Sequence, residues 1–192
     1  MKISCIFRKK DREFLWAINE KKGKKDIDVF SKLLEDFTNT EYLYEFFKKN
    51  QDLLNTPFWE GITIDKAIEK VLDEIYSIEL ELYSIVNQLP GYQHSSLSDV
   101  FVPLHENIYS LNFTNENFRK GKANVLKPMI RLYAIELEDG IFIITGGAIK
   151  LSQKMDGPNF EYEINKLNSL KKFLKQENII DKDSLIDYLN NQ

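Results

Sequence analysis

Cysteine, histidine and long apolar runs are scarce in this sequence. Cys5 is the only cysteine among 192 residues and there are two histidines, so no intrachain disulfide can form and the ligand clusters of zinc sites are missing. We therefore predict no metal and no cofactor. No stretch approaches the roughly 18 apolar residues of a membrane span, and the first ten residues hold too short an apolar run for a signal peptide. We expect a cytoplasmic protein without membrane contacts.

Two common catalytic motifs are also missing. There is no Gly-x-Ser-x-Gly elbow, and the double glycine at Gly146-Gly147 lacks the spacer and the Gly-Lys-Ser/Thr ending of a phosphate-binding loop. Hydrolysis by a nucleophile elbow and nucleotide hydrolysis by a phosphate loop are therefore unsupported. We expect the double glycine to permit a β-bulge or a close approach to the backbone.

Acidic and basic residues are separated along the chain. The formal net charge is only −4, which argues against indiscriminate coating of nucleic acid. Residues 26–88 nevertheless carry fourteen acids and five bases, whereas residues 119–154 carry seven bases and three acids. An acidic middle segment thus precedes a basic one.

The order of apolar patterns predicts a single α+β domain with a mostly antiparallel sheet, because short strands, a helical block, a strand meander and closing helices follow one another. A hydrophobic content of 43% suffices for a core. The predicted parts are an N-terminal strand pair (1–20), an acidic helical block (26–89), a sheet core (106–155) and closing helices (159–192).

The clearest local signal is a β-hairpin between residues 130 and 155. Two β-branched runs, Ile130–Leu137 and Ile141–Ile144, flank Glu138-Asp139-Gly140, which is a hairpin-turn sequence. A third strand is expected at Glu106–Phe113, followed by a polar loop over Thr114–Lys127. The longest helix is expected to run from Thr63 to Leu89. Each helix is expected to begin at a capping residue; these residues are Asp26, Thr40, Thr63, Asn159 and Asp181.

Basic residues near the hairpin ends are the candidates for chemistry. Arg131 begins one strand and Lys150 and Lys154 follow the other, so a hairpin brings them to one end, where cations can offset the charge of a phosphodiester. The loop residues extend this set along a nucleic-acid backbone, and two tyrosines are candidates for base stacking or proton transfer; these residues are Arg119, Lys120, Lys122, Tyr109 and Tyr133. The alternative is that the cations serve solubility and edge protection and that Tyr133 is core.

The residues from Glu106 onward resemble the RelE/ParE toxin superfamily, especially its phage-derived HigB-like branch. The resemblance is carried by the order of the elements. A strand and a basic loop come first, followed by the strand with Arg131-Leu-Tyr133 and the Asp-Gly hairpin turn. The segment Ile-Ile-Thr-Gly-Gly-Ala-Ile-Lys150-Leu-Ser-Gln-Lys154 comes next, and a closing helix ends the chain. It implies a curved antiparallel sheet packed by helices, and many such toxins cut mRNA on the ribosome until an antitoxin binds them. It also implies phosphate contacts for Arg131, Lys150 and Lys154.

The chain departs from this family in length and charge. Such toxins are usually about half as long and strongly basic, whereas this chain inserts the acidic helical block. The family often has an aromatic strand end followed by two adjacent lysines, where this chain has Gly146-Gly147-Ala148-Ile149-Lys150-Leu151.

Three hypotheses follow. The first is an endoribonuclease toxin in which a ribose 2′-hydroxyl attacks the scissile phosphate, Arg131 and Lys150 stabilise the developing charge, and Tyr133 or Tyr109 moves the proton. The second is a non-enzymatic interaction protein of a mobile element or toxin-antitoxin pair, with the long helix 63–89 contacting a partner or a second copy in a homodimer. The third is that the acidic block covers the basic face as an inhibitor.

Overall fold

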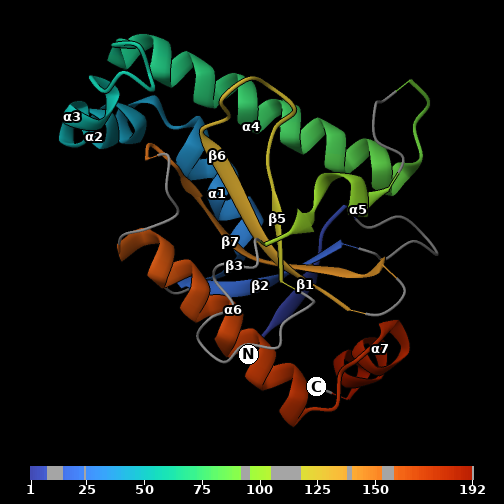
Figure 1. Cartoon of the computed structure of the whole chain (residues 1–192). Helices are drawn as coiled ribbons and strands as arrows, with labels where there is room; N and C mark the ends of the chain where they lie inside the picture. The colour runs from blue at the N-terminus through green and yellow to red at the C-terminus, as the bar shows by residue number, and fades with distance from the viewer. Residues whose placement is uncertain are drawn as a thin grey trace.

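A seven-stranded open sheet with helices on both faces forms the centre of the molecule (Figure 1). The computed structural model describes residues 1–7, 15–23, 25–91, 96–104, 118–137, 140–152 and 158–191. The strands are β1 (Ile3–Cys5), β2 (Leu15–Lys22), β3 (Lys25–Asp28), β4 (Val102–Pro103), β5 (Phe118–Gly121), β6 (Ile130–Glu136) and β7 (Phe142–Ile149). The helices are α1 (Val29–Thr38), α2 (Thr40–Lys49), α3 (Gln51–Leu54), α4 (Ile64–Asn87), α5 (Leu97–Val100), α6 (Pro158–Gln176) and α7 (Lys182–Asn190).

The predicted hairpin is the middle of this sheet. Strands β6 and β7 pair antiparallel from Ile130 opposite Ile149 to Glu136 opposite Phe142. The register shifts between Tyr133 and Ala134, where Thr145 is the extra residue on β7. This irregularity lies beside Gly146 and confirms the bulge that the double glycine predicts. The α+β class and the mostly antiparallel sheet are likewise confirmed.

On its other side, β7 is only half paired. Strand β2 runs parallel to it for three residue pairs, from Leu15 opposite Phe142 to Ala17 opposite Ile144. Strand β1 pairs with the other edge of β2 at Trp16–Ile18, and beyond Ile18 the strand β2 pairs with β3. Among the described residues, no strand therefore pairs with this side of β7 at 146–149.

Different helices cover the two faces of the hairpin. Side chains alternate along β6, so Arg131 and Tyr133 lie on one face and Leu132 on the other. Helix α6 packs on the face of Tyr133, and α1 packs on the face of Leu132, where Leu33 lies against Gly147. Figure 1 shows the two helices on opposite sides of the hairpin. The acidic helix α1 is thus on the face away from Arg131, which gives no support to a covering role for it.

A buried glutamate connects the long helix α4 to the start of β6. Glu74 is 1% exposed, and its carboxylate accepts the backbone N–H of Met129 at 2.8 and 2.9 Å and that of Ile130 at 2.8 Å. The ammonium of Lys70 lies 3.3 Å away. These bonds satisfy backbone donors where the strand begins and fix its position against the helix.

Several predicted boundaries need correction. The first two helix caps are Asp28 and Asn39, not Asp26 and Thr40, because the backbone is still extended in β3 up to Asp28 and α2 follows α1 after one residue. Thr63 and Asp181 do cap α4 and α7. Helix α6 already begins at Pro158, ahead of the expected cap Asn159.

The predicted polar loop over 114–127 is wrong in part, because Phe118–Gly121 forms strand β5. The alternation of buried and polar residues there is too short to recognise: Phe118 and Gly121 are buried, and Arg119 and Lys120 between them are half-buried. The expected strand Glu106–Phe113 lies outside the described residues. No described helix is long and apolar enough to cross a membrane.

We predict that Glu74→Ala lowers the free energy of unfolding by roughly 3 kcal/mol, because it leaves two buried N–H donors without an acceptor. Chemical denaturation measures the change. The control is Glu69→Ala on the exposed side of α4, which should stay within about 0.5 kcal/mol of the wild type. Equal losses in the two variants would contradict the role given to Glu74.

Candidate functional site

Three of the predicted basic residues meet on one face of the sheet. Lys120 on β5 lies opposite Tyr133 on β6, and Arg131 lies two residues before Tyr133 on the same strand. Alternation along the two strands places Lys120 and Arg131 on the same face. Lys122 follows β5 directly and acts electrostatically on Lys120, as Arg131 does. We call Lys120, Lys122 and Arg131 the basic face.

The basic face carries uncompensated positive charge. Partial burial, together with the positive charges of Arg131 and Lys122, lowers the pKa of the Lys120 ammonium. Among the residues that the structure describes, none of the three cations forms an ion pair with a carboxylate. Glu74 attracts Arg131, but its oxygens already accept the N–H groups of Met129 and Ile130. Grouped cations without counter-charges attract anions.

The guanidinium of Arg131 is held in place by the backbone. One terminal nitrogen donates to the carbonyl oxygens of Pro128 at 2.9 Å and Ile130 at 2.7 Å. Burial lowers the pKa of Arg131, yet an arginine stays charged at neutral pH. Because the guanidinium is planar, fixing one nitrogen also limits the orientation of its other N–H donors. A fixed pair of donors suits a bidentate contact with a phosphate.

Tyr133 is buried, which argues against proton transfer from its hydroxyl. Its side chain is 3% exposed, and its ring centroid lies 6.4 Å from that of Phe160 on α6. Burial and the nearby Glu163 carboxylate raise the pKa of Tyr133. The phenol therefore keeps its proton at neutral pH, and the geometry fits the core alternative for this residue.

The other predicted site residues lie elsewhere. Arg119 is on the opposite face, where its guanidinium binds Glu136 at 2.5 and 2.6 Å. Lys150 follows β7 and is half-buried, and its backbone N–H donates to the carbonyl of Met129 at 2.7 Å. Tyr109 and Lys154 fall outside the described residues. Arg131 is thus the one expected phosphate contact that the structure places on the basic face. Its neighbours there are Lys120 and Lys122, which we expected only to extend the site.

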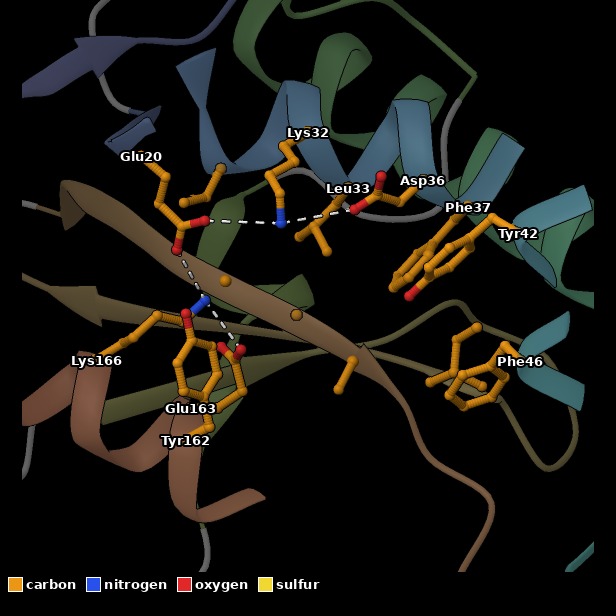
Figure 2. Close-up of a pocket in the computed structure, with 15 residues that line it drawn as sticks. Glu20, Lys32, Leu33, Asp36, Phe37, Tyr42, Phe46, Tyr162, Glu163 and Lys166 are labelled. Carbon is orange, nitrogen blue, oxygen red and sulfur yellow. Dashed lines mark hydrogen bonds and ion pairs between the residues drawn. The ribbon is translucent and has the colours of Figure 1, made fainter. Parts of the chain in front are cut away.

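A cleft of about 200 Å³ lies at the side of β7 that no described strand pairs with (Figure 2). Its floor is the β7 backbone from Gly146 to Ile149, and its walls come from α1, α2 and α6. Five charged side chains form a chain across it: Lys32 lies 3.6 Å from Asp36 and 3.7 Å from Glu20, and Lys166 lies 3.4 Å from Glu20 and 2.9 Å from Glu163.

Glu163 is the buried end of this chain. It is 4% exposed, one carboxylate oxygen binds Lys166, and the other has no hydrogen-bond partner in the described part of the chain. Burial raises the pKa of Glu163, and Lys166 partly offsets this effect. A buried carboxylate with one unsatisfied oxygen is costly, so this group is poised to take a proton or a donor from a ligand.

Gly146 makes room for this arrangement. A Cβ atom on Gly146 would lie 2.2 Å from the unpaired oxygen of Glu163 and 2.2 Å from the ammonium nitrogen of Lys166. The close approach predicted for the double glycine is therefore confirmed. Sequence reasoning missed Glu163 and Lys166, whose only signal is an i, i+3 spacing of opposite charges on a helix that is common on solvated surfaces.

Comparison of the chain with protein-family models, curated proteins and solved structures gives no match. Within the described ranges, no three His, Cys, Asp or Glu side chains are grouped to hold a metal ion. The chemistry of this region is therefore argued from its cations and from the buried carboxylate.

We predict that Glu163→Gln changes how stability depends on pH. A carboxyl group whose pKa is raised above the ordinary 4.5 on folding stabilises the fold fully below that value and loses the contribution as the pH rises through its folded pKa. The variant should therefore gain stability relative to the wild type as the pH increases from about 4.5 towards neutral. Denaturation at several pH values measures this difference, and a constant difference would contradict it.

Proposed function

We propose that this chain is a RelE/HigB-like toxin that binds RNA through the basic face and cuts it there. The observation that carries the proposal is the convergence of Lys120, Lys122 and Arg131 on one face, where no carboxylate of the described residues forms an ion pair with them. The resemblance of residues 106 onward to that superfamily agrees with an antiparallel sheet that presents these cations. The mRNA on the ribosome is the proposed substrate, and an antitoxin the proposed inhibitor.

The cations fit the charge of a phosphodiester. Two lysines on or next to β5 and one arginine on β6 are spaced by the strands, so they can contact successive phosphate oxygens along a single strand of RNA. When a ribose 2′-hydroxyl attacks the phosphorus, it loses its proton, the bond to the 5′-oxygen of the next nucleotide breaks, and that oxygen takes up a proton. Negative charge grows on the phosphate oxygens as this happens. A guanidinium held by Pro128 and Ile130 meets that charge without having to reorganise.

In this proposal Tyr133 has no role as a base, because its phenol is buried and keeps its proton. Lys120 is the better candidate for moving a proton, since its pKa is lowered by burial and by its cationic neighbours. Lys150 adds a further cation near the end of β7. A protein can bind RNA without cutting it, so RNA affinity and RNA cleavage are measured separately.

We predict that Lys120→Ala combined with Arg131→Met weakens binding of a short fluorescein-labelled single-stranded RNA by roughly tenfold or more. The plot of the logarithm of the binding constant against the logarithm of salt concentration should become less steep by an amount that corresponds to about two phosphate contacts. Fluorescence anisotropy at several salt concentrations measures both quantities. Expression in a bacterial host tests cleavage: the wild type should arrest growth with mRNA cut, and the double variant should not.

A matched control removes two charges elsewhere. Lys48 and Lys49 are exposed at the end of α2, and Lys48→Ala combined with Lys49→Ala should leave RNA affinity within about threefold of the wild type. If both double variants bind RNA equally weakly, the affinity depends only on the overall charge of the protein and not on the basic face. Binding without growth arrest or mRNA cleavage would leave an RNA-binding protein and overturn the enzyme.

One observation favours the second function, a protein contact through α4. Tyr76, Leu80 and Tyr83 recur at helical spacing and are 56%, 50% and 45% exposed. Three large apolar side chains on one exposed stripe suit a helix-mediated contact. The occupant proposed for this stripe is a second copy of the chain.

We predict that Leu80→Glu raises the dissociation constant of this homodimer by about tenfold or more, because it places a charge in an apolar contact. Sedimentation equilibrium measures it. The control Asp65→Asn, at an exposed position in the first turn of the same helix, should change self-association by less than about threefold. A wild-type chain that stays monomeric throughout would rule out the dimer.

A further inference from the structure

The cleft beside β7 exposes unused hydrogen-bonding groups of the sheet. The N–H of Lys150 bonds to the carbonyl of Met129, so the bonded pairs of this ladder continue with Ala148 opposite Arg131. Gly147 and Ile149 lie between those pairs and therefore turn their N–H and C=O groups away from β6, toward the side that β2 has left. Gly147 and Ala148 are half-buried rather than covered.

The shape of the cleft suits an extended chain. One wall is apolar and aromatic, with Leu33 and Phe37 from α1 and Phe46 from α2. Phe46 and Tyr42 also line a second, more open depression over α2, so the two hollows share these side chains. Figure 2 shows the aromatic side chains at one end of the β7 floor and Glu20, Glu163 and Lys166 at the other. A ligand that follows the floor from one end to the other is long and narrow.

The charges in the cleft leave one cation missing. Glu20, Asp36 and Glu163 face Lys32 and Lys166, which makes three carboxylates to two ammonium groups. The shortage is visible in the geometry, because Lys166 is shared between Glu20 and Glu163, and one oxygen of Glu163 finds no hydrogen-bond donor among the described residues. A further cation on Glu20 would free Lys166 for Glu163.

We propose that this cleft binds an extended peptide segment of a partner protein, which adds as a strand to β7 and places a Lys or Arg side chain beside Glu20 and Glu163. The backbone of the segment pairs with Gly147 and Ile149, its alternate apolar side chains contact Leu33 and Phe46, and its cation completes the charge chain. A small organic cation would satisfy only the last of these features. This inference is independent of RNA binding on the basic face.

The probe is an acetylated and amidated Thr-Val-Lys-Val-Thr-Val peptide, compared with the same peptide carrying norleucine for lysine. Calorimetry with the wild type should show about a tenfold preference for lysine, and Glu163→Gln should reduce that preference to about threefold or less, because a charge-assisted contact is lost. The variant keeps the size of the side chain, and its fold is checked by denaturation. RNA affinity should be unchanged in it.

Backbone pairing is tested on the peptide itself. N-methylation of alternate residues removes the donors along one edge without changing the side chains. It should weaken binding by about tenfold or more when it blocks the edge that faces β7, and much less when it blocks the other edge. Equal binding of both methylated peptides and the unmethylated one would overturn strand addition. A lysine preference that Glu163→Gln leaves intact, or no binding of any probe at millimolar concentration, would overturn the site.

Discussion

The close packing at Gly146 and Gly147 is the constraint on which the rest of the structure depends. Leu33 from α1 lies against Gly147 on one face of β7, and Glu163 and Lys166 from α6 lie against Gly146 on the other. Neither approach leaves room for a Cβ atom. Two adjacent glycines therefore let helices pack on both sides of one strand at the same point, and their packing fixes where the cleft and the basic face lie.

The buried Tyr133 connects the two sites electrostatically. Tyr133 lies between Arg131, which belongs to the basic face, and Glu163, which belongs to the cleft, and the charges of both act on its hydroxyl. It is thus a packing residue that separates opposite charges rather than a group that reacts. One sheet thus carries a positive face and a net acidic cleft, and each selects ligands of opposite charge.

The sequence allowed the hairpin to be predicted because its signals are local. A β-branched run, a turn and a second run determine a strand pair within about twenty residues, and the α4 helix was predicted from one long apolar period. Strand β5 was missed because four residues with two cations resemble a loop, and β3 was missed because Lys25–Asp28 contains one apolar residue. Those strands form only because β6 and β2 supply partners.

The sequence predicted that the candidate site would be basic, but it did not predict which residues would form it. Charge counting located cations near the hairpin, but the faces on which they lie depend on strand register, which separated Arg119 from Lys120. Glu163 could not have been found, because its burial arises from the packing of a C-terminal helix onto Gly146.

The proposed function requires RNA to lie on the basic face. A titration of the ¹⁵N-labelled wild type with a single-stranded oligoribonucleotide, followed by amide chemical shifts, locates the contact. RNA on the basic face should give the largest shifts at Lys120, Lys122 and Arg131 and small ones at Gly147 and Ile149. Shifts concentrated on α2, α4 or the cleft, with those three amides unmoved, would contradict it.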